Sequence, residues 1–197
     1  MQQPRREQYR YQPRYCEENI WHLCQAPAFR QCSEVLVIAA RGAYFPIFCQ
    51  RAASSSKPAF WDYHVILLWQ ADTTAARGDY ILDFDTRLPF CTPALEYFTR
   101  SFADPDGLPP AWAPCFRLIP APDYIAGLRS DRRHMRTADG WLARPPPWPP
   151  ISTMESNLSR FTDMDDPAFG TVLNQAELHA RLTHSARACP AVWPIPV

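Results

Sequence analysis

The stretch Ala59-Phe60-Trp61-Asp62-Tyr63-His64-Val65-Ile66-Leu67-Leu68-Trp69 decides how the rest of the chain is interpreted. Its aromatic and aliphatic side chains predict a buried β-strand. His64 stands in the middle of that strand, where an imidazole loses its hydration and needs a hydrogen-bond partner. We therefore expect the chemistry of the protein to be built around His64.

Three further strands are expected around the strand that carries His64. They span Glu34 to Ala39, Ala43 to Gln50 and Tyr80 to Thr86. The connection from Ala71 to Gly78 is short and polar, so the strand that follows it is predicted to be an antiparallel neighbour of the His64 strand. Together the four strands predict an antiparallel meander.

The alternation of side chains along a strand predicts which carboxylates share a face with His64. Asp83 and Asp85 have the same parity, so periodicity leaves both open as the acceptor that holds the imidazole. A register that pairs His64 with Asp83 places Trp69 opposite Gly78. Opposing Cβ atoms lie about 5 Å apart, which lets the carboxylate reach the ring.

A candidate nucleophile, Cys16, lies upstream at the start of an expected helix. That helix is indicated by apolar residues at spacings of four, three and one, namely Cys16, Ile20, Leu23 and Cys24. A thiol becomes a nucleophile when it is deprotonated, which a helix N-terminus or a nearby imidazolium favours. Glu17 and Glu18 oppose the thiolate, so a His64 imidazolium is needed more than the helix end. The backbone N–H groups of the first turn would stabilise a negative oxygen beside the sulfur.

Composition limits the partners and the domain count. The 197 residues are 47% hydrophobic and 13% aromatic, which fits one folded domain over residues 1–197. Twenty basic residues balance twenty acidic ones, and Asp131 interrupts the most basic segment, Arg129 to Arg136. Nucleic-acid binding is therefore not expected.

The location is expected to be intracellular. Met1 to Tyr15 is polar, without the apolar segment of a signal or anchor, and the longest apolar run, Val65 to Trp69, is too short to span a membrane. Seven cysteines, an odd number spread along the chain, fit reduced thiols. We expect a soluble monomer of the cytoplasm or nucleus, without a membrane partner.

The remaining segments complete an organisation in which helices follow the strands. We expect a flexible arm over residues 1–14, helices over 92–102, 123–129 and 175–182, a short strand over 115–119, an ordered segment over 157–161, a proline-rich surface crossover over 144–150 and a tail over 189–197. No Cys-x-x-Cys pair occurs, and His179 and His184 lack the His-Glu-x-x-His pattern, so no metal site is expected. The six glycines form no phosphate-binding loop.

Five motifs resemble, in the same order, those of the eukaryotic protein N-terminal glutamine amidohydrolase family. They are Tyr15-Cys16-Glu17-Glu18-Asn19-Ile20-Trp21, Trp61-Asp62-Tyr63-His64-Val65, Asp83-Phe84-Asp85-Thr86-Arg87-Leu88-Pro89-Phe90, Ser130-Asp131-Arg132-Arg133-His134-Met135 and the run from Pro145 to Pro150. The resemblance extends from about Tyr15 to Leu182. Several of the motifs are long enough to be specific.

The resemblance implies an α+β fold of the papain- or transglutaminase-like kind, in which a helix with the nucleophile at its N-terminus packs against an antiparallel sheet. It implies Cys16, His64 and Asp83 as the catalytic residues, and so favours Asp83 over Asp85. The implied reaction needs no cofactor. It hydrolyses the side-chain amide of an N-terminal glutamine through a thioester, giving N-terminal glutamate and ammonia as a step of the N-degron pathway.

Selection of a terminal glutamine requires recognition of its free α-ammonium group. Glu18 and Asp62 are the candidate substrate-binding residues, although Glu18 would also favour a helix start and Asp62 would also cap a structural network. His134 is a candidate for a supporting role because its motif is distinctive.

Other classes remain open on the residues alone. A transglutaminase-like acyltransferase or a cysteine protease would use the same three residues. A non-catalytic adaptor would use the run from Pro145 to Pro150 to bind partners.

Overall fold

The structure, a computed structural model, describes residues 3–54, 56–72 and 77–188. Its main sheet contains β1 (Ser33–Ala40), β4 (Tyr63–Asp72), β5 (Arg77–Leu82), β6 (Cys91–Pro93), β7 (Pro114–Pro120) and β10 (Thr171–Asn174). Two small sheets pair β2 (Phe45–Ile47) with β3 (Ala59–Trp61) and β8 (Arg136–Thr137) with β9 (Gly140–Trp141). The α-helices are α1 (Cys16–Cys24), α2 (Ala94–Ser101), α3 (Ala121–Gly127), α4 (Leu158–Thr162) and α5 (Gln175–Ala188). Four 3-10 turns span Arg6–Gln8, Pro105–Gly107, Pro110–Trp112 and Arg133–Met135.

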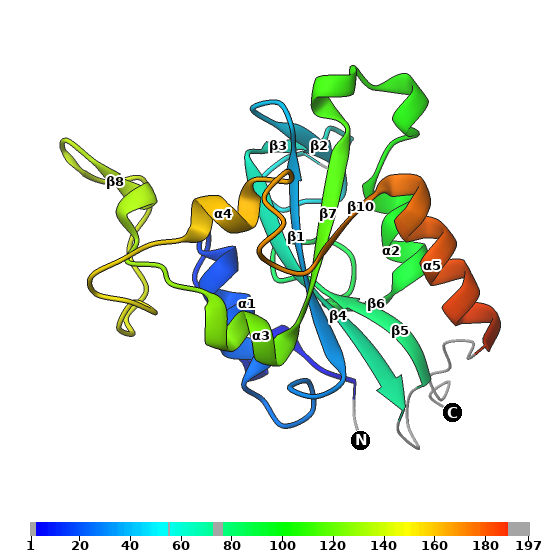
Figure 1. Cartoon of the computed structure of the whole chain (residues 1–197), viewed down its shortest axis with the longest axis horizontal. Helices are drawn as coiled ribbons and strands as arrows, with labels where there is room; N and C mark the ends of the chain where they lie inside the picture. Colours follow the sequence, from blue (N-terminus) through cyan, green and yellow to red (C-terminus); the bar gives the residue numbers. More distant parts are fainter. Residues whose placement is uncertain (1–2, 55, 73–76, 189–197) are drawn as a thin grey trace.

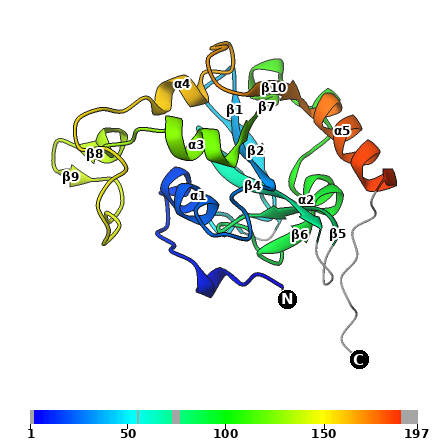
Figure 2. The same cartoon turned by 60° about the horizontal axis from the view of Figure 1, so that its bottom comes forward.

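The main sheet is antiparallel throughout and has the order β10-β7-β1-β4-β5-β6 (Figure 1). Helices α1, α3 and α4 lie on one face, and α2 and α5 lie on the other (Figures 1 and 2). Along β1, Val35 and Val37 pack into the first layer while Leu36 and Ile38 pack into the second. Burial on both faces explains the unbroken apolar runs in the central strands. The predicted α+β class with an antiparallel sheet is confirmed.

The expected four-stranded meander is wrong. β1 pairs directly with β4 on one side and with β7 on the other. The segment expected as a strand from Ala43 to Gln50 contributes only β2, which pairs with β3 outside the main sheet. Pro46 sits in the middle of β2 and has no N–H group, which excludes it from a central ladder.

The strand expected from Ala59 to Trp69 is divided at Asp62. A bend there separates β3 from β4, and a side-chain oxygen of Asp62 accepts a hydrogen bond of 2.9 Å from the N–H group of Tyr63. A side-chain bond of this kind competes with the hydrogen bonds between strands, so β3 ends before β4 begins. The bend turns the strand that carries His64 into the main sheet.

The expected register of the His64 hairpin is also wrong, by two residues. Trp69 pairs with Tyr80 rather than with Gly78, and the ladder ends where Leu67 pairs with Leu82. A shift of two residues keeps every side chain on its predicted face, which is why the pattern did not exclude it. Asp83 therefore lies just beyond the ladder and does not pair with His64 across it.

The N-terminal arm lies against the body of the protein over the residues that the structure describes. The Tyr9 ring packs against Phe29 and Phe90 at centroid distances of 5.7 and 5.9 Å. Gln3 donates a hydrogen bond of 2.8 Å to the carbonyl oxygen of Cys91. The expected tail, residues 189–197, lies outside the described residues. None of the described helices combines the length and hydropathy needed to cross a membrane.

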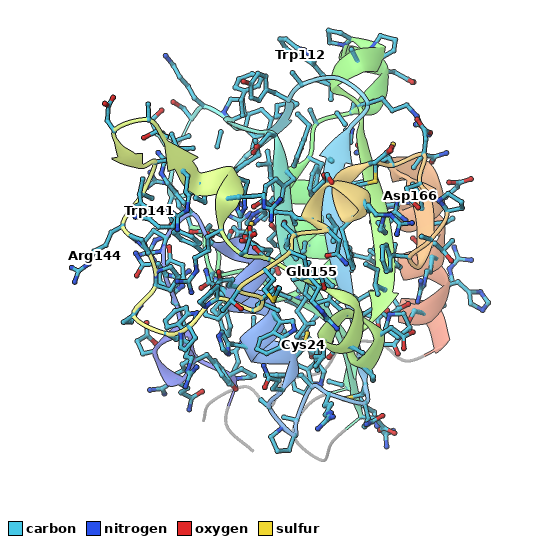
Figure 3. The ribbon with its side chains drawn as sticks, turned by 60° about the vertical axis from the view of Figure 1, so that its left-hand side comes forward. Cys24, Trp112, Trp141, Arg144, Glu155 and Asp166 are labelled. Atoms are coloured by element: carbon cyan, nitrogen blue, oxygen red, sulfur yellow. The ribbon has the colours of Figure 1, made fainter. Side chains whose placement is uncertain are left out.

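The proline-rich segment is tied to the body through Trp148. The indole Nε1 of Trp148 donates a hydrogen bond of 2.9 Å to Glu18, and its ring lies edge-on to His22 at 5.3 Å. Arg144, at the start of the segment, points away from the body (Figure 3). Trp148 therefore packs within the protein, and it gives no support to a partner-binding role for the run from Pro145 to Pro150.

Candidate active site

Cys16 is the first residue of α1 and is almost fully buried, with 4% of its surface exposed. Its sulfur accepts a hydrogen bond from the backbone of Val65, the residue after His64, because α1 packs against β4. Burial raises the pKa of the Cys16 thiol well above its ordinary value, and the Glu17 and Asp85 carboxylates raise it further. The resting group is therefore a thiol that needs an acceptor for its proton.

His64 lies in β4 with no exposed surface. Its Nε2 atom is 3.0 Å from Oδ1 of Asp83, and the Trp61 ring stacks on the imidazole at a centroid distance of 5.1 Å. Its Nδ1 atom is buried and has no hydrogen-bond partner within the described part of the chain. The imidazole is thus fixed at one nitrogen while the other is available.

Asp83 accepts four hydrogen bonds. Oδ1 accepts from His64 Nε2 and from the backbone N–H of Asp85 at 2.8 Å. Oδ2 accepts from Gln50 Nε2 at 3.1 Å and from the Tyr97 hydroxyl at 2.7 Å. Burial alone would raise the pKa of Asp83, but the charge and hydrogen bond of His64, with the bonds from Gln50 and Tyr97, lower it to about 2.

Asp85 plays a different part from Asp83. Its Oδ1 accepts a hydrogen bond of 2.6 Å from the Tyr11 hydroxyl. The structure therefore brings Asp83, and not Asp85, to the ring of His64. Burial and the neighbouring Asp83 raise the pKa of Asp85.

The pKa of His64 reflects two opposing effects. Burial lowers it, but the negative charge of Asp83, the hydrogen bond to Asp83 and the charge of Asp85 outweigh burial and raise it. A His64 that takes up a proton is therefore stabilised in place.

His64, Asp83 and Asp85 could hold a metal ion by distance alone, since one ligand atom from each lies within 4.8 Å of the others. The hydrogen bonds of the site argue against this use. Both oxygens of Asp83 and the Nε2 atom of His64 are already engaged with each other or with neighbouring donors. A metal would have to displace the bonds that keep Asp83 ionised.

Glu18 does not fit its predicted role as a substrate-binding residue. It has no exposed surface, and Arg132 donates to its two oxygens at 2.6 and 2.8 Å. Trp148 donates to one of the same oxygens at 2.9 Å. Three donors and the lack of exposed surface commit this carboxylate to holding α1, and they keep it away from an α-ammonium group in the cavity.

Asp62 remains a candidate substrate-binding residue. It is exposed and lines a cavity of about 680 Å³ that also reaches Cys16. The same wall includes His134, Arg14, Arg51 and the buried Asp85, so its charge is mixed. Asp62 is the exposed carboxylate that this wall offers to a ligand with a positive charge.

Three residues of the site were missed by sequence reasoning: Tyr11, Gln50 and Tyr97. Each donates a hydrogen bond to Asp83 or Asp85 from a segment distant in the chain. Tyr97 lies on an expected helix, but no periodic pattern indicates that its hydroxyl meets a carboxylate. These contacts depend on tertiary packing alone.

The sequence was compared with known families and proteins. Residues 11–182 match the family model described as N-terminal glutamine amidase. A relative from Homo sapiens, named protein N-terminal glutamine amidohydrolase, is 36% identical over 189 residues, which cover 90% of this chain and 90% of the relative. Relatives of the same name from Bos taurus and Danio rerio are 35% and 38% identical, covering 91% and 77% of this chain and 90% and 77% of their own lengths. The chain therefore belongs to the N-terminal glutamine amidase family, a family of amidohydrolase enzymes.

Proposed function

We propose that this chain hydrolyses the side-chain amide of an N-terminal glutamine, with Cys16, His64 and Asp83 as its catalytic triad. Family membership supports the substrate, and from the sequence resemblance we propose that the reaction is a step of the N-degron pathway. One observation carries the residue assignment. His64 is held at Nε2 by Asp83, its Nδ1 has no hydrogen-bond partner among the residues that the structure describes, and the next residue of β4 contacts the sulfur of Cys16.

The arrangement supports a papain- or transglutaminase-like core. A helix that begins with the cysteine packs against an antiparallel sheet, and the sheet carries the histidine in one strand and the aspartate after the next. The start of α1 would position both the nucleophile and the backbone N–H groups that stabilise its intermediate, so the proposed fold supports the proposed reaction.

In the first step, the sulfur of Cys16 attacks the carbon of the substrate carboxamide while the thiol proton passes to Nδ1 of His64. The carbonyl oxygen becomes an oxyanion and accepts hydrogen bonds from the first-turn N–H groups of α1, which have no side-chain cap. The proton then moves from Nδ1 to the nitrogen of the intermediate. The C–N bond breaks, ammonia leaves and a thioester remains on Cys16.

In the second step, water attacks the thioester carbon and gives a proton to Nδ1 of His64. The C–S bond breaks, and the sulfur recovers that proton. The product is an N-terminal glutamate, and the protein returns to its starting state. All atoms and protons come from the substrate, water and the triad, so the sequence of steps uses no cofactor.

We further propose that Asp62 recognises the α-ammonium group of the substrate. Its carboxylate lies in the wall of the cavity that reaches Cys16, and it is exposed, so it can accept a charged hydrogen bond without first losing a buried partner. A group that binds the terminus equally in the ground and transition states changes KM more than kcat.

A pair of peptides tests the proposed reaction. A Gln-initiated peptide should yield ammonia and an N-terminal glutamate, while its N-acetylated twin should remain unchanged. Cys16→Ala should lower kcat by at least about 10³-fold, because no other group supplies the thioester. Cys32→Ala, a thiol of intermediate exposure outside the cavity, is the matched control.

Three outcomes of the peptide experiment would contradict the proposal. Cleavage of the peptide backbone would indicate a protease, and preferential transfer of the acyl group to an added amine would indicate an acyltransferase. Activity retained by Cys16→Ala would reject the mechanism.

Asp83→Asn and Asp85→Asn separate the two carboxylates. Asp83→Asn should lower kcat by about 10³-fold or more, because an amide neither fixes the tautomer nor stabilises the imidazolium. The catalytic step needs neutral His64, so kcat/KM should rise with pH through the pKa of His64, which Asp83 raises. In Asp83→Asn the carboxylate charge is lost, so the inflection in the pH profile of the remaining kcat/KM should move to lower pH.

Asp85→Asn keeps an acceptor for Tyr11 and serves as the control for Asp83→Asn. It should change kcat by less than about tenfold, since its contact with His64 is through charge alone. A larger loss in Asp85→Asn than in Asp83→Asn would show that the wrong carboxylate has been assigned.

Asp62→Asn tests recognition of the substrate terminus. KM for the Gln-initiated peptide should rise about tenfold with little change in kcat, because one charged contact of the bound state is lost. Asp72→Asn, an exposed carboxylate paired with Arg77 at 3.4 Å on the far part of β4, is the control. An unchanged KM in Asp62→Asn would remove Asp62 from the substrate site.

A further inference from the structure

Another buried carboxylate, that of Glu17, lies beside Cys16, and the proposed mechanism does not use it. Glu17 follows Cys16 in α1 and has no exposed surface. Its Oε2 atom accepts a hydrogen bond of 3.1 Å from the Tyr63 hydroxyl, and its Oε1 atom lies 3.4 Å from Nε2 of His134. The same Nε2 atom is 3.2 Å from the Tyr63 hydroxyl. Glu17, Tyr63 and His134 therefore form one connected cluster.

A negative charge at Glu17 opposes the chemistry required of its neighbour. After burial, the Glu17 carboxylate is the largest cause that raises the pKa of the Cys16 thiol. A catalytic thiol next to an uncompensated, buried carboxylate would resist ionisation. A cation beside Glu17 would offset this negative charge, and His134 lies in position to provide one.

The adjacent Glu18 shows the same solution with a permanent cation. Arg132 donates to both oxygens of Glu18 and is itself only 6% exposed. Arg132 has φ of 65°, a left-handed conformation that a non-glycine residue adopts at a cost. Arg132 directly precedes the 3-10 turn that carries His134. One short segment therefore places Arg132 against Glu18 and His134 against Glu17.

We propose that His134 is a positioning residue which, as an imidazolium paired with Glu17, cancels the negative charge beside Cys16 and makes its thiol easier to ionise. The inference rests on the proposed role of Cys16 as nucleophile. His134 acts through Glu17 and takes no proton from the substrate.

Other charged and titratable groups also face this region. They are Glu18 on α1, Asp62 in the bend before β4, Tyr63 at the start of β4, His64 within β4, Asp85 after β5, Tyr124 on α3, Arg132 before the 3-10 turn, and Arg14 and Arg51 on the cavity wall. Of these, Arg132 is bonded to Glu18 and His64 to Asp83. Within the described residues, no other cation of this region forms an ion pair with Glu17, and His134 lies 3.4 Å from its Oε1 atom.

The environment of His134 favours its charged form. Burial lowers its pKa, but the hydrogen bond and charge of Glu17, followed by the charges of Asp62 and Glu18, outweigh burial and raise it above the ordinary value. The imidazolium therefore persists to higher pH than a histidine in water would. Above its pKa, the compensation of Glu17 is lost.

The pH dependence of Cys16 alkylation tests this inference without any substrate. Iodoacetamide reacts with the thiolate, and the modified Cys16 peptide is quantified by mass spectrometry at each pH. His134→Gln keeps a hydrogen-bond donor but removes the charge, so the inflection should move up by about one pH unit. Glu17→Gln should move it down, and the double variant should return it close to that of the unchanged protein.

A structural role of His134 would give a different pattern. It would lower the melting temperature and leave the inflection of the folded protein in place. An unmoved inflection in His134→Gln, or a double variant that stays as high as His134→Gln, would overturn the proposal. If His134→Gln does not fold, Glu17→Gln decides, since an inflection that fails to move down contradicts the role given to Glu17.

His179→Gln, an exposed histidine on α5, is the matched control and should leave the inflection unchanged. The outcomes also separate this inference from the proposed function. Shifted alkylation without release of ammonia from the Gln-initiated peptide would retain the coupling and reject the reaction. Release of ammonia without shifted alkylation would retain the reaction and reject the role of His134.

Discussion

A carboxylate without access to solvent is the constraint on which the rest of the site depends. Burial of an ionised Asp83 costs several kcal/mol unless its oxygens are hydrogen-bonded. The donors come from four separate places: the loop after β2, helix α2, the turn after β5 and strand β4. Satisfying one carboxylate therefore fixes these segments relative to each other, and it leaves His64 in a single orientation with Nδ1 available.

The same principle extends to the helix that carries Cys16. α1 begins with a cysteine followed by two glutamates, and both carboxylates are fully buried. Arg132 bonds to Glu18, and His134 lies against Glu17. The permanent cation fixes the helix, while the titratable one adjusts the charge next to the thiol. The two buried glutamates of α1 are thus each paired with a basic residue, so that an apolar region can contain an ionisable nucleophile.

The local features of this site could be predicted from the sequence, since helix starts and buried strands depend on neighbouring residues. Cys16 begins a helix and His64 lies in a buried strand, as their patterns predicted. The register between β4 and β5 could not be predicted, because a two-residue shift keeps every side chain on the same face of the sheet. The pairing ends at Leu82. The pairing of Glu18 could not be predicted, because its partner Arg132 lies 114 residues further along the chain. Only the folded chain brings such groups together.

The most direct test of the central claim is to trap the covalent intermediate on Cys16. The protein is mixed with a Gln-initiated peptide, quenched in acid within one turnover, and analysed by intact and peptide-level mass spectrometry. The account predicts an adduct equal to the peptide less one ammonia, attached to Cys16 and lost with time as the N-terminal glutamate appears. The same experiment is run on Asp83→Asn, in which the second step is also slowed. Formation of glutamate by that variant with no adduct on Cys16 would contradict the account. An adduct on another cysteine would also contradict it.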